Sequence, residues 1–365
     1  MSNFATRDGT TSYRERFNYL PDSHFHNFRG LTLSSIGLGT YLGNPDDTTD
    51  QKYTAAIKLA VSLGCNVIDS AINYRFQRSE RSIGKAISLL LTNNFKRSEI
   101  FLSTKGGFLS FDTKGEIHPR EWFKNEFVSR NLCKPEELVA SCHCISPGYI
   151  KAEIEQSLKN LGVKGIDLYY LHNPEIQLME VNKSEFEERL KLAFSALEES
   201  VSEKKIQFYG IATWEGLLVD SKSKEFVSLE DIVKLAKEIA GENHHFKAIQ
   251  LPYSLATPDA FLKTNQPQEG KLFSAINLAS NLGLGVFCSA SLMQGQIIGY
   301  LTDSLRQKFQ EKLKTDAQLG LQFVRSTPGV TTALVGMKQL EHVKENLATA
   351  NIETMNTKNF NEIFE

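Results

Sequence analysis

Short runs rich in β-branched and aromatic residues recur along the chain, and longer segments with helical periodicity separate them. The runs are largely apolar in the middle, as expected for strands buried on both faces of a parallel sheet. They span residues 33–40, 66–70, 100–105, 166–172, 206–213, 246–254, 285–291 and 331–337. The segments between them place apolar residues three and four positions apart, which predicts amphipathic helices, for example over 51–64, 149–161 and 185–201.

Eight strand–helix units in series, with no long polar divider, predict an α/β fold of the closed (β/α)₈ (TIM) barrel type. An open doubly wound sheet is the alternative. We expect one barrel domain over residues 33–365, preceded by an N-terminal extension, residues 1–32, that covers the bottom of the barrel.

One connection is much longer than barrel loops usually are. It is an insertion after the third strand, residues 106–149, and its length predicts a functional or interacting segment. Within it, the stretch "PREWFKNEFVSR" predicts a short helix.

Composition narrows the classes of partner. Lys and Arg number 41 and Asp and Glu 43, a formal charge of −2, and no basic stripe stands out. We therefore expect neither nucleic acid nor a membrane as a partner. The polar first thirty residues carry no secretory signal, and no apolar run is long enough to span a membrane. Five scattered cysteines favour reduced thiols, and hence a cytoplasmic protein.

Polar residues stand where several predicted strands end. Asp69 ends the second run, Lys105 the third and His172 the fourth, while Tyr74 lies in the loop after the second. In a barrel these strand ends share one rim, which is where active sites of this fold are built. The four side chains are therefore expected to meet.

These four residue types suit proton transfer to a carbonyl. A tyrosine ordinarily has a pKa near 10, and a nearby ammonium lowers it. Lys105 would supply that charge, held by Asp69, and His172 would donate a hydrogen bond to an oxygen becoming an alkoxide. Tyr74 would act as general acid in reduction and as general base in oxidation.

From about residue 33 to residue 346 the chain resembles the aldo-keto reductase superfamily. The resemblance rests on motifs whose order, spacing and strand context agree: "GLGTYLG" (37–43), "VIDSAINYR" (67–75), "SERSIGKAI" (79–87), "IFLSTK" (100–105), "SLKNLGVKGIDLYYLHNPE" (157–175), "YGIAT" (209–213), "IQLPYSL" (249–255) and "GVTTALVGMKQLEHVKENL" (329–347). The resemblance implies a catalytic tetrad of Asp69, Tyr74, Lys105 and His172. It also implies reversible hydride transfer between a nicotinamide and a small aldehyde, ketone or alcohol, without metal.

The resemblance implies cofactor-binding residues after several strands: Gly39, Thr40, Thr213, Gln250, Ser289, Leu292, Gly336, Met337, Lys338, His342 and Asn346. The sequence departs from the family pattern at three of the cofactor-site positions: Ala212, Ser289 and His342. Ala212 stands where family members usually have a polar side chain that binds the carboxamide of the nicotinamide. Ser289 replaces the aromatic residue that stacks on the nicotinamide in many members. Many members have arginine where His342 stands, and arginine is the better partner for phosphate. We expect NADP(H), with Lys338 as the main charge, and NAD(H) is the alternative.

Other features have competing interpretations. The third glycine of "GLGTYLG" is one residue late for a dinucleotide fingerprint, so a tight turn is favoured. Cys142, His143 and Cys144, with Cys133 nearby, suggest zinc ligands, but only one residue separates the paired cysteines and packing is favoured.

Two tryptophans, Trp122 in the insertion and Trp214 after the fifth strand, are candidates for a substrate-pocket wall, although hydrophobic anchoring of their loops explains them as well. Two rival functions also stay open. One is a nucleotide-binding regulatory or scaffold barrel with little turnover, favoured by Ala212 and Ser289. The other is a zinc enzyme using the cysteine-rich insertion.

Overall fold

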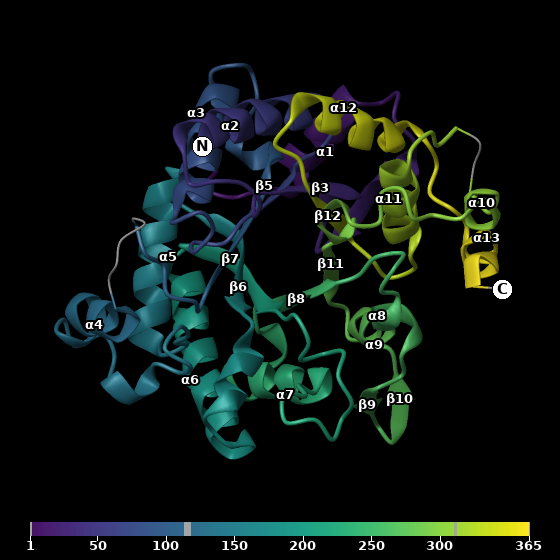
Figure 1. The fold of residues 1–365 in the computed structure, drawn as a ribbon. Helices are drawn as coiled ribbons and strands as arrows, with labels where there is room; N and C mark the ends of the chain where they lie inside the picture. The colour runs from purple at the N-terminus through teal and green to yellow at the C-terminus, as the bar shows by residue number, and fades with distance from the viewer. Residues whose placement is uncertain (1, 113–117, 310–311, 365) are drawn as a thin grey trace.

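The chain closes into a barrel of eight parallel strands, in the order β11-β12-β3-β4-β5-β6-β7-β8 (Figure 1). The computed structural model describes residues 2–112, 118–309 and 312–364. The barrel strands are β3 (Ile36–Gly39), β4 (Val67–Asp69), β5 (Phe101–Gly106), β6 (Ile166–His172), β7 (Ile206–Ala212), β8 (Phe246–Pro252), β11 (Gly285–Ser289) and β12 (Thr332–Gly336). This architecture confirms the predicted (β/α)₈ fold.

Helices cover the outside of the barrel (Figure 1). One longer helix follows each strand: α2 (Asp47–Ser62), α3 (Arg78–Leu91), α5 (Pro147–Leu161), α6 (Lys183–Ser202), α7 (Leu229–Ala240), α9 (Ala275–Asn281), α11 (Asp316–Ser326) and α12 (Leu340–Ala348). Elements outside this series include α1 (Arg7–Arg16), α4 (Pro119–Phe123), α8 (Asp259–Leu262), α10 (Asp303–Arg306), α13 (Thr357–Asn361) and the antiparallel pair β9 (Gln266–Gln268) and β10 (Lys271–Phe273). Within the described residues, no helix has the length and apolar character needed to cross a membrane.

Local side-chain chemistry fixes where several helices begin and end. The Asp46 carboxylate accepts the Thr49 N–H at 2.7 Å and so caps α2. Gly162 ends α5 in the left-handed conformation, with φ at 62°. The boundaries of α2 thus lie a few residues before those expected from apolar periodicity alone, because caps and first turns are polar.

A hairpin closes the amino-terminal end of the barrel. Its strands are β1 (Phe25–Phe28) and β2 (Leu31–Ser34), and the Phe28 ring packs edge-on against Phe101, Phe208 and Phe287 at centroid distances of 5.6–5.8 Å. A Cβ at Gly285 would lie 2.4 Å from the Phe28 ring, so this close approach requires glycine. The residues that fill this end of the barrel are therefore aromatic and apolar.

The insertion after β5 packs beside α5, outside the ring of strands (Figure 1). The predicted helix forms as α4 and continues as one π-helical turn, Lys124–Val128. Phe127 on that turn packs against Tyr149 of α5 at 4.6 Å. Closer to the barrel, Phe108 bridges to His143 as an isolated antiparallel pair, which brings both ends of the insertion to the strand ends.

Candidate active site

The carboxyl ends of the strands surround a cavity of about 910 Å³. Asp69 is the last residue of β4, Lys105 the next to last of β5 and His172 the last of β6, and Tyr74 lies on the loop between β4 and α3. The predicted residues Asp69, Tyr74 and His172 line the cavity, and Lys105 lies buried behind them.

A buried ion pair forms the floor of this site. Lys105 Nζ donates to Asp69 Oδ2 at 2.6 Å and to the Ser70 carbonyl oxygen at 2.6 Å. Asp69 Oδ1 accepts from Ser103 Oγ at 2.7 Å and from Gln250 Nε2 at 3.0 Å. Burial lowers the pKa of Lys105, and the adjacent Asp69 carboxylate opposes that shift. The charge-assisted bonds fix both groups.

Tyr74 lies above the ion pair, between two other rings. Lys105 Nζ is 5.2 Å from the Tyr74 ring centroid, and the ring meets Tyr41 at 4.9 Å and His172 at 5.9 Å. Burial raises the pKa of Tyr74 above its ordinary value, and the negative charge of Asp69 adds to that effect. The expected lowering of this pKa by Lys105 is therefore wrong here, because Asp69 neutralises the ammonium and burial penalises the phenolate. The phenol keeps its proton.

His172 is neutral for the same physical reason. Burial lowers its pKa well below the ordinary range, and the charge of Lys105 lowers it further. Its Nδ1 has no partner among the residues the structure describes, and its ring packs edge-on against Phe108 at 4.9 Å. An uncharged imidazole beside a protonated phenol is a pair of hydrogen-bond donors suited to an oxygen that gains negative charge.

The insertion holds the backbone of His172. The Gln177 amide donates to His143 Nδ1 at 2.8 Å, so the His143 proton resides on Nε2 and is donated to the His172 carbonyl oxygen at 2.7 Å. Arg189 Nη1 donates to the Gln177 side-chain oxygen at 2.7 Å and orients that amide. Burial lowers the pKa of His143 to about 4, which keeps it neutral.

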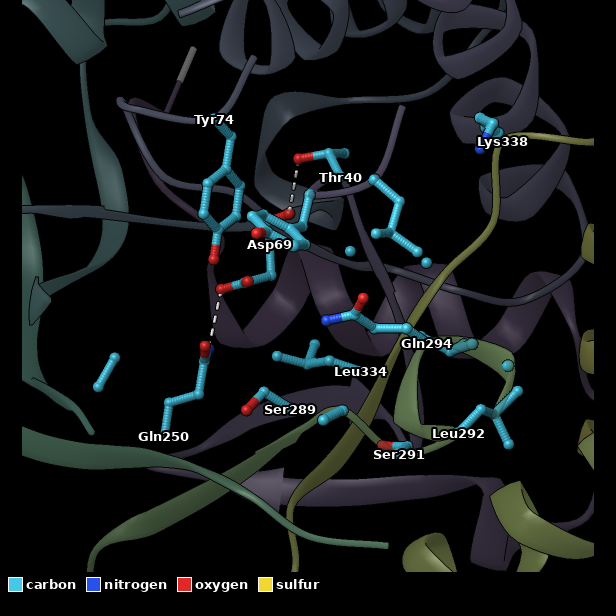
Figure 2. Close-up of a pocket in the computed structure, with 18 of the residues that line it drawn as sticks. Thr40, Asp69, Tyr74, Gln250, Ser289, Ser291, Leu292, Gln294, Leu334 and Lys338 are labelled. Carbon is cyan, nitrogen blue, oxygen red and sulfur yellow. Dashed lines mark hydrogen bonds between the residues drawn. The ribbon is translucent and has the colours of Figure 1, made fainter. Parts of the chain in front are cut away.

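Most of the predicted cofactor residues line the same cavity: Gly39, Thr40, Thr213, Gln250, Ser289, Leu292, Gly336, Lys338, His342 and Asn346. Figure 2 shows Tyr74 near one end, Lys338 near the other, and Gln294 and Leu334 between them. The cavity is therefore elongated, with Asp69 and Tyr74 at one end and the Lys338 cation at the other.

Two predicted residues lie elsewhere. The Met337 side chain is fully buried in the hydrophobic core, because β12 ends one residue earlier and the chain turns inward there. Trp122 does not line the cavity and packs inside the insertion, with Phe111 at 4.7 Å and Phe127 at 5.3 Å. Trp214 lines the cavity and is half exposed, and its backbone N–H donates to Glu175 Oε1 at 2.9 Å.

Several cavity residues had no signal strong enough to identify them from the sequence: Tyr41, Leu42, Tyr53, Asn73, Phe108, Asn173, Ser291, Gln294, Ile298 and Glu345. Tyr41 and Phe108 stand one and three residues beyond the predicted strand ends at 40 and 105, and this position at the rim was the one weak signal they carried. The residues after Ser289 lie on a loop whose path depends on tertiary packing.

The cysteine cluster does not form a metal site within residues 2–112, 118–309 and 312–364. Ser146 Oγ lies 3.3 Å from Cys133 Sγ and 3.2 Å from Cys144 Sγ, while His143 points away toward His172. The described part of the chain holds these cysteines as free thiols.

Residues 35–365 match the Aldo/keto reductase family. The chain belongs to this family. Family membership makes it an oxidoreductase acting on carbonyl or alcohol groups.

Individual relatives are distant. The chain is 24% identical over 332 residues to the Bacillus subtilis "Uncharacterized oxidoreductase YqkF", and the match covers 88% of each protein. It is 32% identical over 147 residues to the Escherichia coli "NADH-specific methylglyoxal reductase", covering 39% of each.

Solved aldo-keto reductases share the fold. The holo form of the Bacillus halodurans enzyme AKR11C1 superposes with a TM-score of 0.63 at 20% identity, covering 93% of this chain and 95% of that one. A Klebsiella pneumoniae aldo/keto reductase in complex with NADP and acetate gives 0.60 at 21% identity, covering 93% and 94%.

Proposed function

We propose that the protein reduces an aldehyde or ketone to an alcohol, or catalyses the reverse, with NADP(H) as cofactor. The observation that carries this proposal is the convergence of Asp69, Lys105, Tyr74 and His172 at one end of an elongated cavity. A bound nicotinamide would supply the hydride in reduction and accept it in oxidation.

Each of the four side chains has a role in this proposal. Tyr74 donates its proton to the substrate oxygen during reduction and removes it during oxidation. His172, held neutral, orients the same oxygen through a hydrogen bond. Lys105 and Asp69 fix the electrostatic environment of the phenol as a hydrogen-bonded pair 2.6 Å apart.

The cavity walls fit a dinucleotide. Thr213 Oγ1 and Asn346 Oδ1 are buried, belong to cavity-lining residues and have no partner among the described residues. Buried polar atoms normally have partners, so these two favour a polar ligand along the wall. Thr213 would hold the nicotinamide end and Asn346 the adenosine end.

Lys338 supports NADP(H) over NAD(H). It lies on the cavity wall, half buried, and within the described residues it has no carboxylate partner to neutralise it. Two similar structures from Klebsiella pneumoniae contain NADP or NADPH, whereas the Escherichia coli relative is named as NADH-specific. The Lys338 cation on the cavity wall, which His342 also lines, is the feature that favours the phosphorylated cofactor in our proposal.

The substrate end of the cavity is aromatic. Tyr41 packs against Tyr74 and Phe108 against His172, each at 4.9 Å, and Trp214 lines the same cavity. Such walls fit a small carbonyl compound with an apolar or aromatic substituent, and Trp214 is our candidate for the outer contact.

A regulatory or scaffold barrel is the second candidate. Ala212 and Ser289 line the cavity and offer the nicotinamide neither a polar side chain at 212 nor a stacking ring at 289. Turnover of a broad carbonyl panel that includes 4-nitrobenzaldehyde, with NADPH and with NADH, separates the two functions. Turnover with NADPH supports the enzyme, and tight NADPH binding without turnover of any compound would support the scaffold.

A further inference from the structure

Three residues directly after Tyr74 have a left-handed backbone. The φ angles are 51° at Arg75, 56° at Phe76 and 65° at Gln77. Residues other than glycine adopt this conformation rarely, and a run of three persists only where surrounding contacts enforce it. The contacts of this tripeptide therefore bear on how Tyr74 is held.

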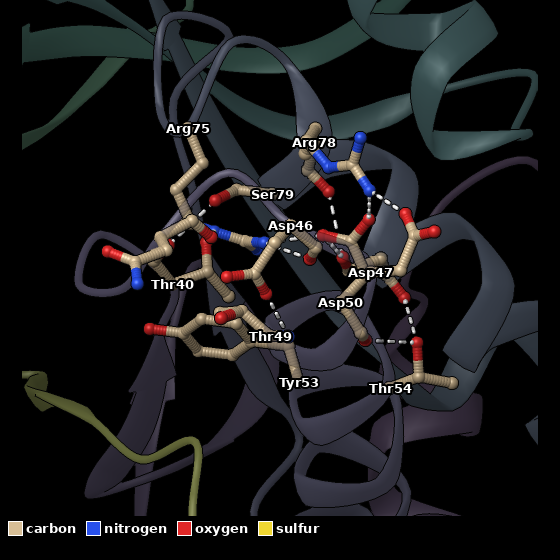
Figure 3. Close-up of polar contacts among 12 residues, drawn as sticks. Thr40, Asp46, Asp47, Thr49, Asp50, Tyr53, Thr54, Arg75, Arg78 and Ser79 are labelled. Carbon is tan, nitrogen blue, oxygen red and sulfur yellow. Dashed lines mark hydrogen bonds and ion pairs between the residues drawn. The ribbon is translucent and has the colours of Figure 1, made fainter.

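The Arg75 side chain ties the tripeptide to the loop between β3 and α2 and to the first turns of α2 (Figure 3). Its Nε donates to the Asn44 carbonyl oxygen at 3.0 Å. Its Nη2 donates to the Asp46 carbonyl oxygen at 3.4 Å and also forms an ion pair with the Asp50 carboxylate. The guanidinium also lies over the Tyr53 ring, 5.3 Å from its centroid. The side chain is only 2% exposed, so these contacts are shielded from water.

Gln77 ties the other end of the tripeptide to the insertion. Its Nε2 donates to the Ser110 carbonyl oxygen at 2.7 Å, and its Oε1 accepts from Asn160 at 3.0 Å. The tripeptide is thus held from two sides, and the two anchors come from different elements.

The segment that Arg75 contacts, residues 41–46, begins with two residues that line the cavity, Tyr41 and Leu42. Tyr41 packs against Tyr74 at 4.9 Å, and Tyr53 donates its hydroxyl to the Leu42 carbonyl oxygen at 2.6 Å. Arg75 therefore joins the loop that carries the phenol to the loop that packs against the phenol's ring. Displacement of either loop would move Tyr74 Oη relative to the substrate oxygen.

We propose that Arg75 is a positioning residue for Tyr74. It enforces the left-handed turn and fixes the distance between the Tyr74 loop and the 41–46 segment. This inference rests on the proposed function, because the consequence is a slower proton transfer. A residue that only stabilised the fold would lower the free energy of unfolding and leave kcat unchanged in the folded enzyme.

Arg75→Met tests the proposal, with Arg78→Met as the matched control. Arg78 also pairs with Asp50, at 2.6 Å, but touches neither loop carbonyl. We expect Arg75→Met to lower kcat by about 10- to 100-fold, the scale of a misplaced catalytic group, with NADPH affinity nearly unchanged. Arg78→Met should retain the wild-type kcat. A folded Arg75→Met enzyme with wild-type kcat, or an equal loss in Arg78→Met, would overturn the proposal.

Two further variants cover misfolding and backbone strain. Arg75→Gly accepts a positive φ without strain but lacks the anchor, so it should lose kcat as Arg75→Met does, and wild-type kcat in this variant would refute the anchor. Arg75→Lys keeps the charge toward Asp50 and should fold even if Arg75→Met does not. It should lose part of kcat because one ammonium cannot reproduce the guanidinium contacts, and an unchanged kcat would count against the proposal.

Amide hydrogen exchange keeps the test independent of turnover. Arg75→Met should speed exchange in residues 41–46 and 72–77, and Arg78→Met should not. If the wild-type protein turned over no carbonyl, the proposed function would fail. The exchange result would still decide whether Arg75 anchors the loop: faster exchange supports the anchor, and unchanged exchange refutes it.

Discussion

Burial sets the protonation states of the two groups that would meet the substrate oxygen. It raises the pKa of Tyr74 and lowers the pKa of His172, so one keeps its proton and the other stays uncharged near neutral pH. Both shifts have the same cause, since a poorly solvated site penalises the charged form of each group. The site is therefore prepared for reduction before any substrate arrives.

This predicts a flat pH profile for reduction. Neither group changes charge between about pH 6 and about pH 8, because the Tyr74 pKa lies above its ordinary value and the His172 pKa lies well below the ordinary value of about 6.5. The measurement is kcat against pH with NADPH saturating. An acid limb with its midpoint near the ordinary histidine pKa would show that His172 titrates and that this electrostatic account is wrong.

The proposed preference for NADPH rests on one cation, Lys338. Lys338→Glu replaces the cation of the cavity wall with an anion, so NADPH should bind at least about 10-fold more weakly, as expected for loss of a charged hydrogen bond. NADH affinity should change little, because NADH lacks the 2′-phosphate. Equal effects on the two cofactors, measured by fluorescence titration, would place the phosphate elsewhere.

At the scale of elements, α5 supports the start of the insertion through a buried carboxyl group. Glu153 Oε2 accepts the Gly107 N–H at 2.8 Å, and its Oε1 lies 2.8 Å from the Tyr149 hydroxyl, which also lies 2.8 Å from the Phe108 carbonyl oxygen. Burial raises the pKa of Glu153 to about 8. A protonated Glu153 donates to Tyr149, which donates to Phe108, and the chain of bonds is complete.

Glu153→Gln should therefore fold normally and change the pH dependence of stability. In the wild type, unfolding releases the Glu153 proton between its ordinary pKa of 4.5 and its folded pKa of about 8, so this group's contribution to stability is full below pH 4.5 and declines as pH rises through that window. The slope is about 1.4 kcal/mol per pH unit for one proton. Glutamine does not titrate, so the variant lacks this slope. Urea unfolding at several pH values measures the free energy of unfolding of both proteins and so compares their pH dependence. Parallel stability curves for the two proteins would contradict a protonated Glu153.

The elements themselves were predictable to different degrees. The run at 166–172 predicted β6 because its apolar pattern reflects burial on both faces, which the sequence encodes locally. The left-handed turn at 75–77 could not be predicted, because Arg, Phe and Gln have no preference for it and distant partners such as Asp50 and Ser110 enforce it. The position of Trp122 could not be predicted either, because the sequence allowed both a pocket wall and packing inside the insertion, and only its neighbours Phe111 and Phe127 distinguish the two.

At the scale of the whole molecule, the aromatic packing around Phe28 and the candidate catalytic residues lie at opposite ends of the barrel. The hairpin residue Phe28 closes the amino-terminal end against three rings, whereas the catalytic candidates stand at the carboxyl ends of the strands. Strand-end residues were predictable as a site because the closed barrel brings them to one rim, whatever their separation in sequence. Their protonation states were not, because these depend on burial.

Phe28→Ala should separate stability from catalysis. Loss of a buried phenylalanine costs about 3–5 kcal/mol of unfolding free energy, because a cavity replaces the ring. The kcat of the folded fraction should stay at the wild-type value. Urea unfolding and steady-state kinetics at low temperature measure both, and a large fall in kcat without a fall in stability would contradict the separation.

The most direct test is a single-turnover measurement in which a carbonyl compound that the wild type reduces is added to Tyr74→Phe with NADPH already bound. The variant keeps the ring that packs against Tyr41 and His172 and loses only the hydroxyl. We expect unchanged NADPH affinity and oxidation of the bound cofactor at least about 10²-fold slower than in the wild type. An unchanged rate of NADPH oxidation would mean that another group delivers the proton, and would contradict the assignment of Tyr74 as the general acid.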